Sequence, residues 1–221
     1  MRRNLIHWRG LLLTSSLLLL FVLGTRGQDS REFLLWNTTS VQAPIQHLYC
    51  IKLSTKTQYL PQDQQRKETY LDLSLYRKMN SWLQLGVAFR GAQHVDTNSN
   101  VAEYRPQFIT KIAFKLSPVK FTSTNRLARR YFSGGQHYFR YYHNLFIHLP
   151  SLAHWPKPYI GEEVFLKLNH DHIHLLRAYA GLHVIKHQHF KLDTFYTLQH
   201  SKSGASWYDS DIVGMNLNFL L

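Results

Sequence analysis

Arginine is the residue type whose spacing in this chain is most suggestive of chemistry. Arg126 and Arg130 are four residues apart in an alternating segment, so both share one face of a strand with Lys120. The same alternation places more charged side chains on the corresponding faces of other segments. Such side chains can pair with one another or line a passage that favours anions. The candidate lining residues are Arg90, Arg105, Arg126, Arg130, Arg140, Glu163 and Arg177.

Histidine offers a second chemistry. His170, His172 and His174 recur at a spacing of two beside Asp171, which puts the three imidazoles on one face of a strand. Imidazoles with a carboxylate suit zinc, copper or nickel. However, the 14 histidines are scattered through the chain, and the sequence places no second cluster that would complete a ligand shell. We therefore expect neither a metal nor another cofactor.

The spacings typical of enzymes are missing. The sequence has no Gly-x-Ser-x-Gly, no His-Glu-x-x-His, no phosphate loop and no dinucleotide fingerprint. His200 lies close to Ser201, Ser203 and Ser206, but any serine-rich loop shows such proximity. We expect no enzymatic activity. The alternative is a lipid-modifying enzyme of the outer membrane that uses a His and a Ser at the barrel rim.

The candidate residues lie in segments that alternate apolar and polar side chains, which is the period of a β-strand. Because single-chain bacterial barrels have an even number of strands, we expect ten or twelve. Either the segment near residue 36 is not a full strand, or one strand is not apparent. Pro106 interrupts one segment and predicts that the strand leaves the membrane there. The eleven alternating segments lie near 34–43, 49–59, 69–79, 81–91, 103–116, 119–132, 138–149, 159–169, 172–185, 189–200 and 209–221.

The last segment alternates up to the final residue. Its apolar side chains are two residues apart, as in the closing strand of an outer-membrane barrel, whose apolar face contacts lipid. We therefore expect Phe219 and Leu221 to face lipid and to serve as the assembly signal. The full apolar set is Val213, Met215, Leu217, Phe219 and Leu221.

The first 27 residues have the pattern of a secretory signal. Arg2, Arg3 and Arg9 precede an apolar run over 11–23, and small residues before Gln28 suit cleavage. The run is shorter than the roughly 20 residues that a membrane-spanning helix needs. We expect a cleaved signal peptide over 1–27 and a single domain over 28–221. The one cysteine, Cys50, leaves no internal disulfide for this exported chain.

The amino-acid composition further limits the class of protein to which this chain can belong. The formal net charge is +13, but the basic residues are spread along the chain and form no run, so we expect no nucleic-acid partner. The mean hydropathy is -0.29, and no helix-length apolar segment follows residue 27. A helical membrane protein is thereby excluded, whereas a barrel is not, because its strands are only half apolar. Aromatic residues make up 14% of the chain, which suits the two lipid–water boundaries of a barrel.

The alternative fold is a soluble periplasmic β-barrel that binds a small ligand, because its strands would alternate as well. The segments are about 11–14 residues long, above the usual 5–6 residues of soluble strands. We therefore expect an all-β, antiparallel up-and-down barrel that spans the bacterial outer membrane. Its partners would be outer-membrane lipid and the export and barrel-assembly machinery, and a monomer is expected rather than an oligomer.

Five motifs follow one another in order along the chain. They are Trp36, Arg126 to Phe132, Phe139 to Tyr142, Glu162 to Phe165, and Arg177 to Leu182. Their order and spacing resemble those of domain of unknown function 2490, a family of bacterial outer-membrane barrels without an established activity. The resemblance covers about 32–221 and implies fold and location but no chemistry. The chain departs from the family pattern at Ala128, where that pattern has a glutamate two residues after the first arginine.

The predicted interior has more basic than acidic side chains. Its acids are Asp72, Glu103, Glu163 and Asp193. In a small barrel such charges pair across strands because an unpaired buried charge is costly, and ten or twelve strands leave little open width. We therefore expect a structural role for these residues, with a narrow passive pore that favours anions as the other possibility.

Overall fold

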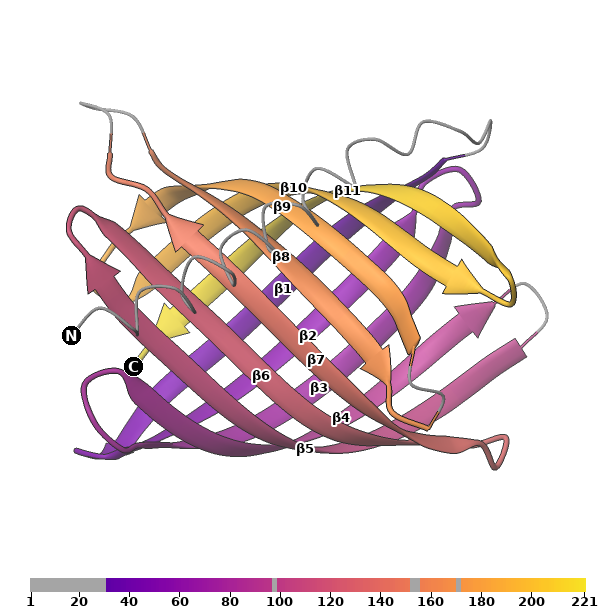
Figure 1. Ribbon diagram of the computed structural model, residues 1–221, viewed down its shortest axis with the longest axis horizontal. Helices are drawn as coiled ribbons and strands as arrows, with labels where there is room; N and C mark the ends of the chain where they lie inside the picture. Colours follow the sequence, from indigo (N-terminus) through magenta and orange to yellow (C-terminus); the bar gives the residue numbers. More distant parts are fainter. Residues whose placement is uncertain (1–30, 97–98, 152–155, 170–171) are drawn as a thin grey trace, which may run out of the picture.

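The computed structural model describes residues 31–96, 99–151, 156–169 and 172–221, which form one closed β-barrel (Figure 1). The predicted all-β barrel is confirmed. No helix among these residues is long and apolar enough to cross a membrane. The strands are β1 (Glu32–Gln46), β2 (Tyr49–Leu60), β3 (Gln65–Lys78), β4 (Leu83–Asp96), β5 (Ser99–Leu116), β6 (Val119–Phe132), β7 (His137–His148), β8 (Lys157–Lys167), β9 (His172–Lys186), β10 (Phe190–Ser203) and β11 (Ser206–Leu220).

The barrel has eleven strands, so the expected even number is corrected to an odd one. The segment near residue 36 is a full strand, β1, and no further strand is needed to close the sheet. With an odd number, the first and last strands run in the same direction. β1 therefore pairs with β11 in parallel, from Glu32 opposite Ser210 to Gln42 opposite Leu220, whereas every other pair is antiparallel.

Parallel closure places the two ends of the described chain at opposite rims of the barrel. The C-terminal rim is the end where β11 stops and β10 begins, at the left of Figure 1. The N-terminal rim is the other end, where β1 begins and where the hairpin between β10 and β11 lies. Arg31 therefore lies at the N-terminal rim and Leu221 at the C-terminal rim.

Pro106 lies inside β5, opposite Phe89 of β4. That the strand leaves the membrane at this proline stays a prediction. On the other side, the pairing of β5 with β6 passes from Tyr104 directly to Gln107, and neither Arg105 nor Pro106 has a paired residue. The N–H that proline lacks is therefore not required by that ladder, which explains how the strand continues through this position.

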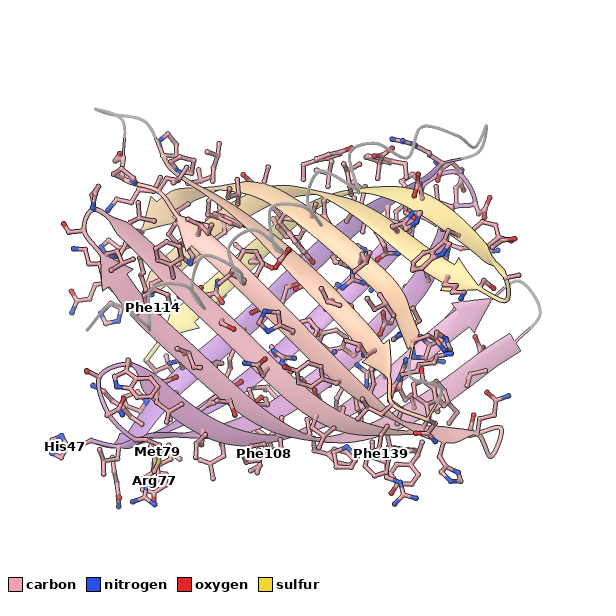
Figure 2. All side chains as sticks on the ribbon, in the orientation of Figure 1. His47, Arg77, Met79, Phe108, Phe114 and Phe139 are labelled. Atoms are coloured by element: carbon pink, nitrogen blue, oxygen red, sulfur yellow. The ribbon has the colours of Figure 1, made fainter. Side chains whose placement is uncertain are left out.

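Because side chains alternate along each strand, the barrel has an apolar outer surface and a largely polar interior. Large apolar side chains cover the outer surface, where Leu71 is 56%, Val87 55% and Phe108 50% exposed. Figure 2 shows Phe108 and Phe139 projecting away from the barrel. The buried side chains of the described residues include 14 polar or charged ones but only 12 hydrophobic ones. The polarity is the reverse of that of a soluble domain, whose core is apolar.

Glycines opposite aromatic residues allow the wall to curve. Each of four inward-facing glycines is paired with an aromatic residue of the neighbouring strand, and an added Cβ would overlap that ring. The ring therefore lies flat over the glycine and covers the exposed backbone, an arrangement that also fixes strand register. The pairs are Tyr76 with Gly86, Phe146 with Gly161, Tyr159 with Gly181, and Phe195 with Gly214.

Replacing Gly161 with alanine should destabilise the barrel. The new Cβ would overlap the ring of Phe146, and displacing a packed ring typically costs about 1–3 kcal/mol. The measurement is the free energy of unfolding in detergent. Gly91→Ala is the matched control, because an added Cβ at Gly91 meets nothing within 4 Å. Equal effects of the two substitutions would contradict the ring-over-glycine packing.

Candidate functional site: the charged lumen

The barrel encloses a cavity of about 530 Å³. Among the described residues, eight Lys and Arg side chains but only four Asp and Glu side chains line it. All seven charged residues singled out from the sequence lie on the cavity wall, and they come from β4 to β9. They are Arg90, Arg105, Arg126, Arg130, Arg140, Glu163 and Arg177.

Glu103 is the centre of the tightest charged cluster. Its side chain has no exposed surface and is clamped by two arginines. Arg105 donates from both Nε and a terminal nitrogen at 2.7 Å, and Arg130 does the same from the next strand, at 2.6 Å for its terminal nitrogen. His94 Nε2 lies 2.7 Å from the same carboxylate. The two bidentate arginines join β5 to β6 through strong charge-assisted bonds, and His94 adds the contact to β4.

A second carboxylate, Asp72, joins β3 to β4 and β5. It accepts hydrogen bonds from Arg90 Nε at 2.9 Å, from Ser74 at 2.6 Å and from Gln107 at 3.1 Å. Its residual exposure is 4%. The guanidinium of Arg90 also lies over the ring of Tyr70, 3.6 Å from its centroid. These bonds satisfy a buried acid that would otherwise be costly.

The third carboxylate, Glu163, braces the other side of the barrel. Arg177 donates to it at 3.0 Å, and the hydroxyls of Tyr142 and Tyr179 donate at 2.7 and 2.8 Å. Arg177 also donates to Gln199 on β10. The three clusters together cross-link most of the wall, as expected for a small barrel that fills its interior with paired charges.

Several cations in the lumen have no such acid. Among the described residues, no ion pair joins Arg126 or Arg140 to a carboxylate, and the Nε of Arg126 is buried without a hydrogen-bond partner. Arg140 lies opposite Ala128, the position at which the chain departs from the family pattern it resembles. A carboxylate at residue 128 would face Arg140. The methyl group of Ala128 supplies no such charge.

Charged side chains lie at different depths along the lumen. Glu103 lies towards the N-terminal rim, and Asp72 and Arg126 lie near the middle of their strands. Lys52, Lys111 and Asp193 lie closer to the C-terminal rim. The ammonium of Lys111 contacts the ring of Tyr76, 3.6 Å from its centroid, and not an acid. Lys111 and Arg126 are therefore inward-facing cations without an ion pair among the described residues, and they are available to an anion.

The structure also assembles a chain of hydrogen bonds that no sequence spacing indicated. Thr122 Oγ1 lies 2.9 Å from His148 Nε2, His148 Nδ1 lies 2.9 Å from His183 Nε2, and His183 Nδ1 lies 2.6 Å from Asp193 Oδ1. The four residues come from β6, β7, β9 and β10, and all line the cavity. Their separations of 10 to 35 residues along the chain explain why pattern analysis missed them. We call this set the Thr–His–His–Asp relay.

The remaining expected sites lie outside the lumen. Phe219 faces outward and packs against Phe190, 5.4 Å between ring centroids, and Leu221 is 75% exposed just after β11. At the N-terminal rim, His200 stacks on Trp207 and bonds to Asp209. Among the described residues, no serine is hydrogen-bonded to His200.

The three histidines at a spacing of two lie partly within the described residues. His170 and Asp171 lie outside the described residues. His174 packs edge-on against Phe165, 6.2 Å between ring centroids. In the part of the chain that the structure describes, no group of three or more His, Cys, Asp or Glu side chains is placed to hold a metal ion.

Comparison with known proteins agrees with this architecture at the level of family. No curated protein matches the chain in sequence. The sequence model described as "Protein of unknown function (DUF2490)" matches residues 33–209, which span β1 to the start of β11 and include every charged cluster of the lumen. The chain therefore belongs to the DUF2490 family.

Proposed function

We propose that this protein is a bacterial outer-membrane barrel, exported by its N-terminal signal, whose charged lumen is braced by ion pairs and leaves a narrow passage that favours anions. The observation that carries the proposal is the reversed polarity of the wall, apolar outside and charged inside. An apolar surface that encircles the whole barrel would be a liability in water. In a bilayer, the same surface is the one that lipid requires.

The dimensions of the barrel support this location. Its strands are 11 to 18 residues long, which suits tilted strands that cross a hydrocarbon core. Exposed aromatic residues occur near both rims, where a barrel in a bilayer meets the lipid–water boundaries. Tyr59, Tyr104 and Tyr131 lie towards the N-terminal rim, and Trp82 lies at the C-terminal rim.

The outer surface of β6 and β7 carries one polar cluster. The hydroxyl of Tyr141 and Nδ1 of His143 both lie within hydrogen-bond distance of Asn125 Oδ1, at 2.6 and 2.8 Å. The pairing of these polar atoms reduces the cost of placing the three side chains against lipid. We propose that the barrel is a monomer in outer-membrane lipid and that the export and assembly machinery are its transient partners.

The lumen supports a narrow passage more than a wide one. Eight strands leave an interior just filled by side chains and 16 leave an open channel. Eleven strands fall between these, in agreement with the cavity of about 530 Å³. With twice as many basic as acidic side chains on its wall, the passage would attract small anions and repel cations.

Neutralising one unpaired lumenal cation should weaken the anion preference. In planar bilayers, we expect small anion-selective conductance steps, and Arg126→Gln should lower the anion-to-cation permeability ratio by roughly two- to tenfold. This is the effect of about 0.5–1.4 kcal/mol between an ion and a unit charge roughly 8 Å away in a largely aqueous lumen. The measurement is the reversal potential across a chloride gradient.

Arg129→Gln is the matched control for that experiment. Arg129 is on the same strand but faces outward, with its guanidinium between the rings of Tyr131 and Phe139. Its loss should leave the permeability ratio unchanged. An inserted barrel that does not conduct, or that shows the same selectivity after loss of Arg126, would contradict the proposed passage.

A further inference from the structure

The Thr–His–His–Asp relay has only one arrangement of protons when both rings are neutral and Asp193 is ionised. The carboxylate of Asp193 can only accept, so Nδ1 of His183 must carry a proton. Nε2 of His183 is then bare and accepts from Nδ1 of His148. Nε2 of His148 is bare in turn and accepts from the hydroxyl of Thr122. The bonds thus form a directed chain from a hydroxyl to a carboxylate.

A hydroxyl that donates to a histidine, itself oriented through a second group by a carboxylate, is the arrangement that activates a nucleophile. We propose that Thr122 and His148 are the nucleophile and general base of an esterase site inside the lumen. His183 and Asp193 are positioning residues that fix the tautomer of His148. The inference goes beyond the proposed passage and does not depend on the location of the barrel.

The charge of the surrounding wall indicates the substrate class. Arg126 lies on the same strand as Thr122 and faces the same way, four residues or roughly 13 Å along β6. Its buried Nε has no partner in the described residues. A ligand with an anionic group near Arg126 and an ester beside Thr122 would run along the inner face of β6. The substrate class is therefore a carboxylic ester that carries an anionic group.

The reaction can be written with its atoms balanced. Thr122 Oγ1 forms a bond to the carbonyl carbon while its proton moves to His148 Nε2. The positive charge can pass to His183, beside Asp193, through transfer of the Nδ1 proton of His148. Collapse of the tetrahedral intermediate breaks the bond to the leaving alcohol, which takes the proton from His148 Nε2. Water then hydrolyses the acyl-threonine by the same route and restores the hydroxyl.

The test uses the purified full-length barrel in detergent and two probes. An alkyl fluorophosphonate should phosphonylate Thr122 with release of fluoride, and peptide mass analysis locates the adduct. The anionic ester 4-nitrophenyl succinate should be hydrolysed faster than the neutral 4-nitrophenyl butyrate. We expect Thr122→Val to abolish both reactions and Thr122→Ser to retain them. His148→Gln should lower the labelling rate by about 100-fold or more, the usual contribution of a general base.

A separate measurement distinguishes a positioning role of Asp193 from a purely structural one. Asp193→Asn should lower the limiting rate of labelling at saturating probe while the probe concentration for half-saturation stays the same. Thr38→Val is the control, because Thr38 lines the same cavity outside the relay. Folded wild-type protein without an adduct on Thr122, or ester hydrolysis that survives Thr122→Val, would overturn the proposal.

Discussion

Glu103→Gln is expected to lower the free energy of unfolding by about 3–5 kcal/mol, the usual cost of removing one partner from a buried ion pair. Glu103 is the shared acceptor of Arg105 and Arg130, and its side chain has no exposed surface. A neutral amide would leave two guanidinium groups close together in the lumen without an anion. The measurement is urea unfolding of the barrel in detergent.

Glu32→Gln is the control for this first prediction. Glu32 forms an ion pair with Lys67 in which both side chains are more than 40% exposed. Loss of an exposed pair typically costs less than about 1 kcal/mol. If Glu103→Gln were no more costly than Glu32→Gln, the lumenal clusters would not be what holds the wall together.

The second large effect is expected on the outer surface. Leu73→Arg should destabilise the barrel in a bilayer by about 2–4 kcal/mol, because Leu73 faces outward near the middle of β3 and would contact the bilayer midplane. Leu116 is also exposed but lies at the end of β5, at the C-terminal rim. Leu116→Arg should therefore cost only about 0–1 kcal/mol.

Comparing these two substitutions distinguishes an outer surface in lipid from one in water. In lipid, the cost depends on depth, so Leu73→Arg is much worse than Leu116→Arg. In water, both substitutions would replace an exposed apolar residue by a charge, with effects within about 0.5 kcal/mol. The measurement is the free energy of unfolding in lipid vesicles. Two small and equal effects would support the soluble barrel.

The faces of the strands could be predicted from the sequence because a strand has a period of two. Lys52, Asp72 and Arg90 alternate with apolar neighbours, so the inner and outer sets follow without knowledge of the fold. Closure could not be predicted in the same way. The pairing of β1 with β11 joins residues about 178 positions apart, such as Ser40 and Asn218, and no local pattern specifies it.

The contacts of the lumen were only partly predictable. Glu103 and Arg105 are two residues apart on one strand, so their proximity follows from the alternation. The second clamp by Arg130 depends on the register of β5 and β6, which the sequence does not specify. The Thr–His–His–Asp relay was harder to predict, because Thr122 and Asp193 come from strands separated by three others. Side chains that meet across a lumen are not separated by any characteristic number of residues in the sequence.

The most direct test of the central claim is the location and folding of the full-length protein in the bacterial envelope. Envelope fractionation, followed by electrophoresis of heated and unheated samples, measures both. We expect the protein in the outer-membrane fraction, with faster migration before boiling than after, because a barrel braced by buried ion pairs resists detergent until it is heated. Recovery as a soluble periplasmic protein would contradict the account.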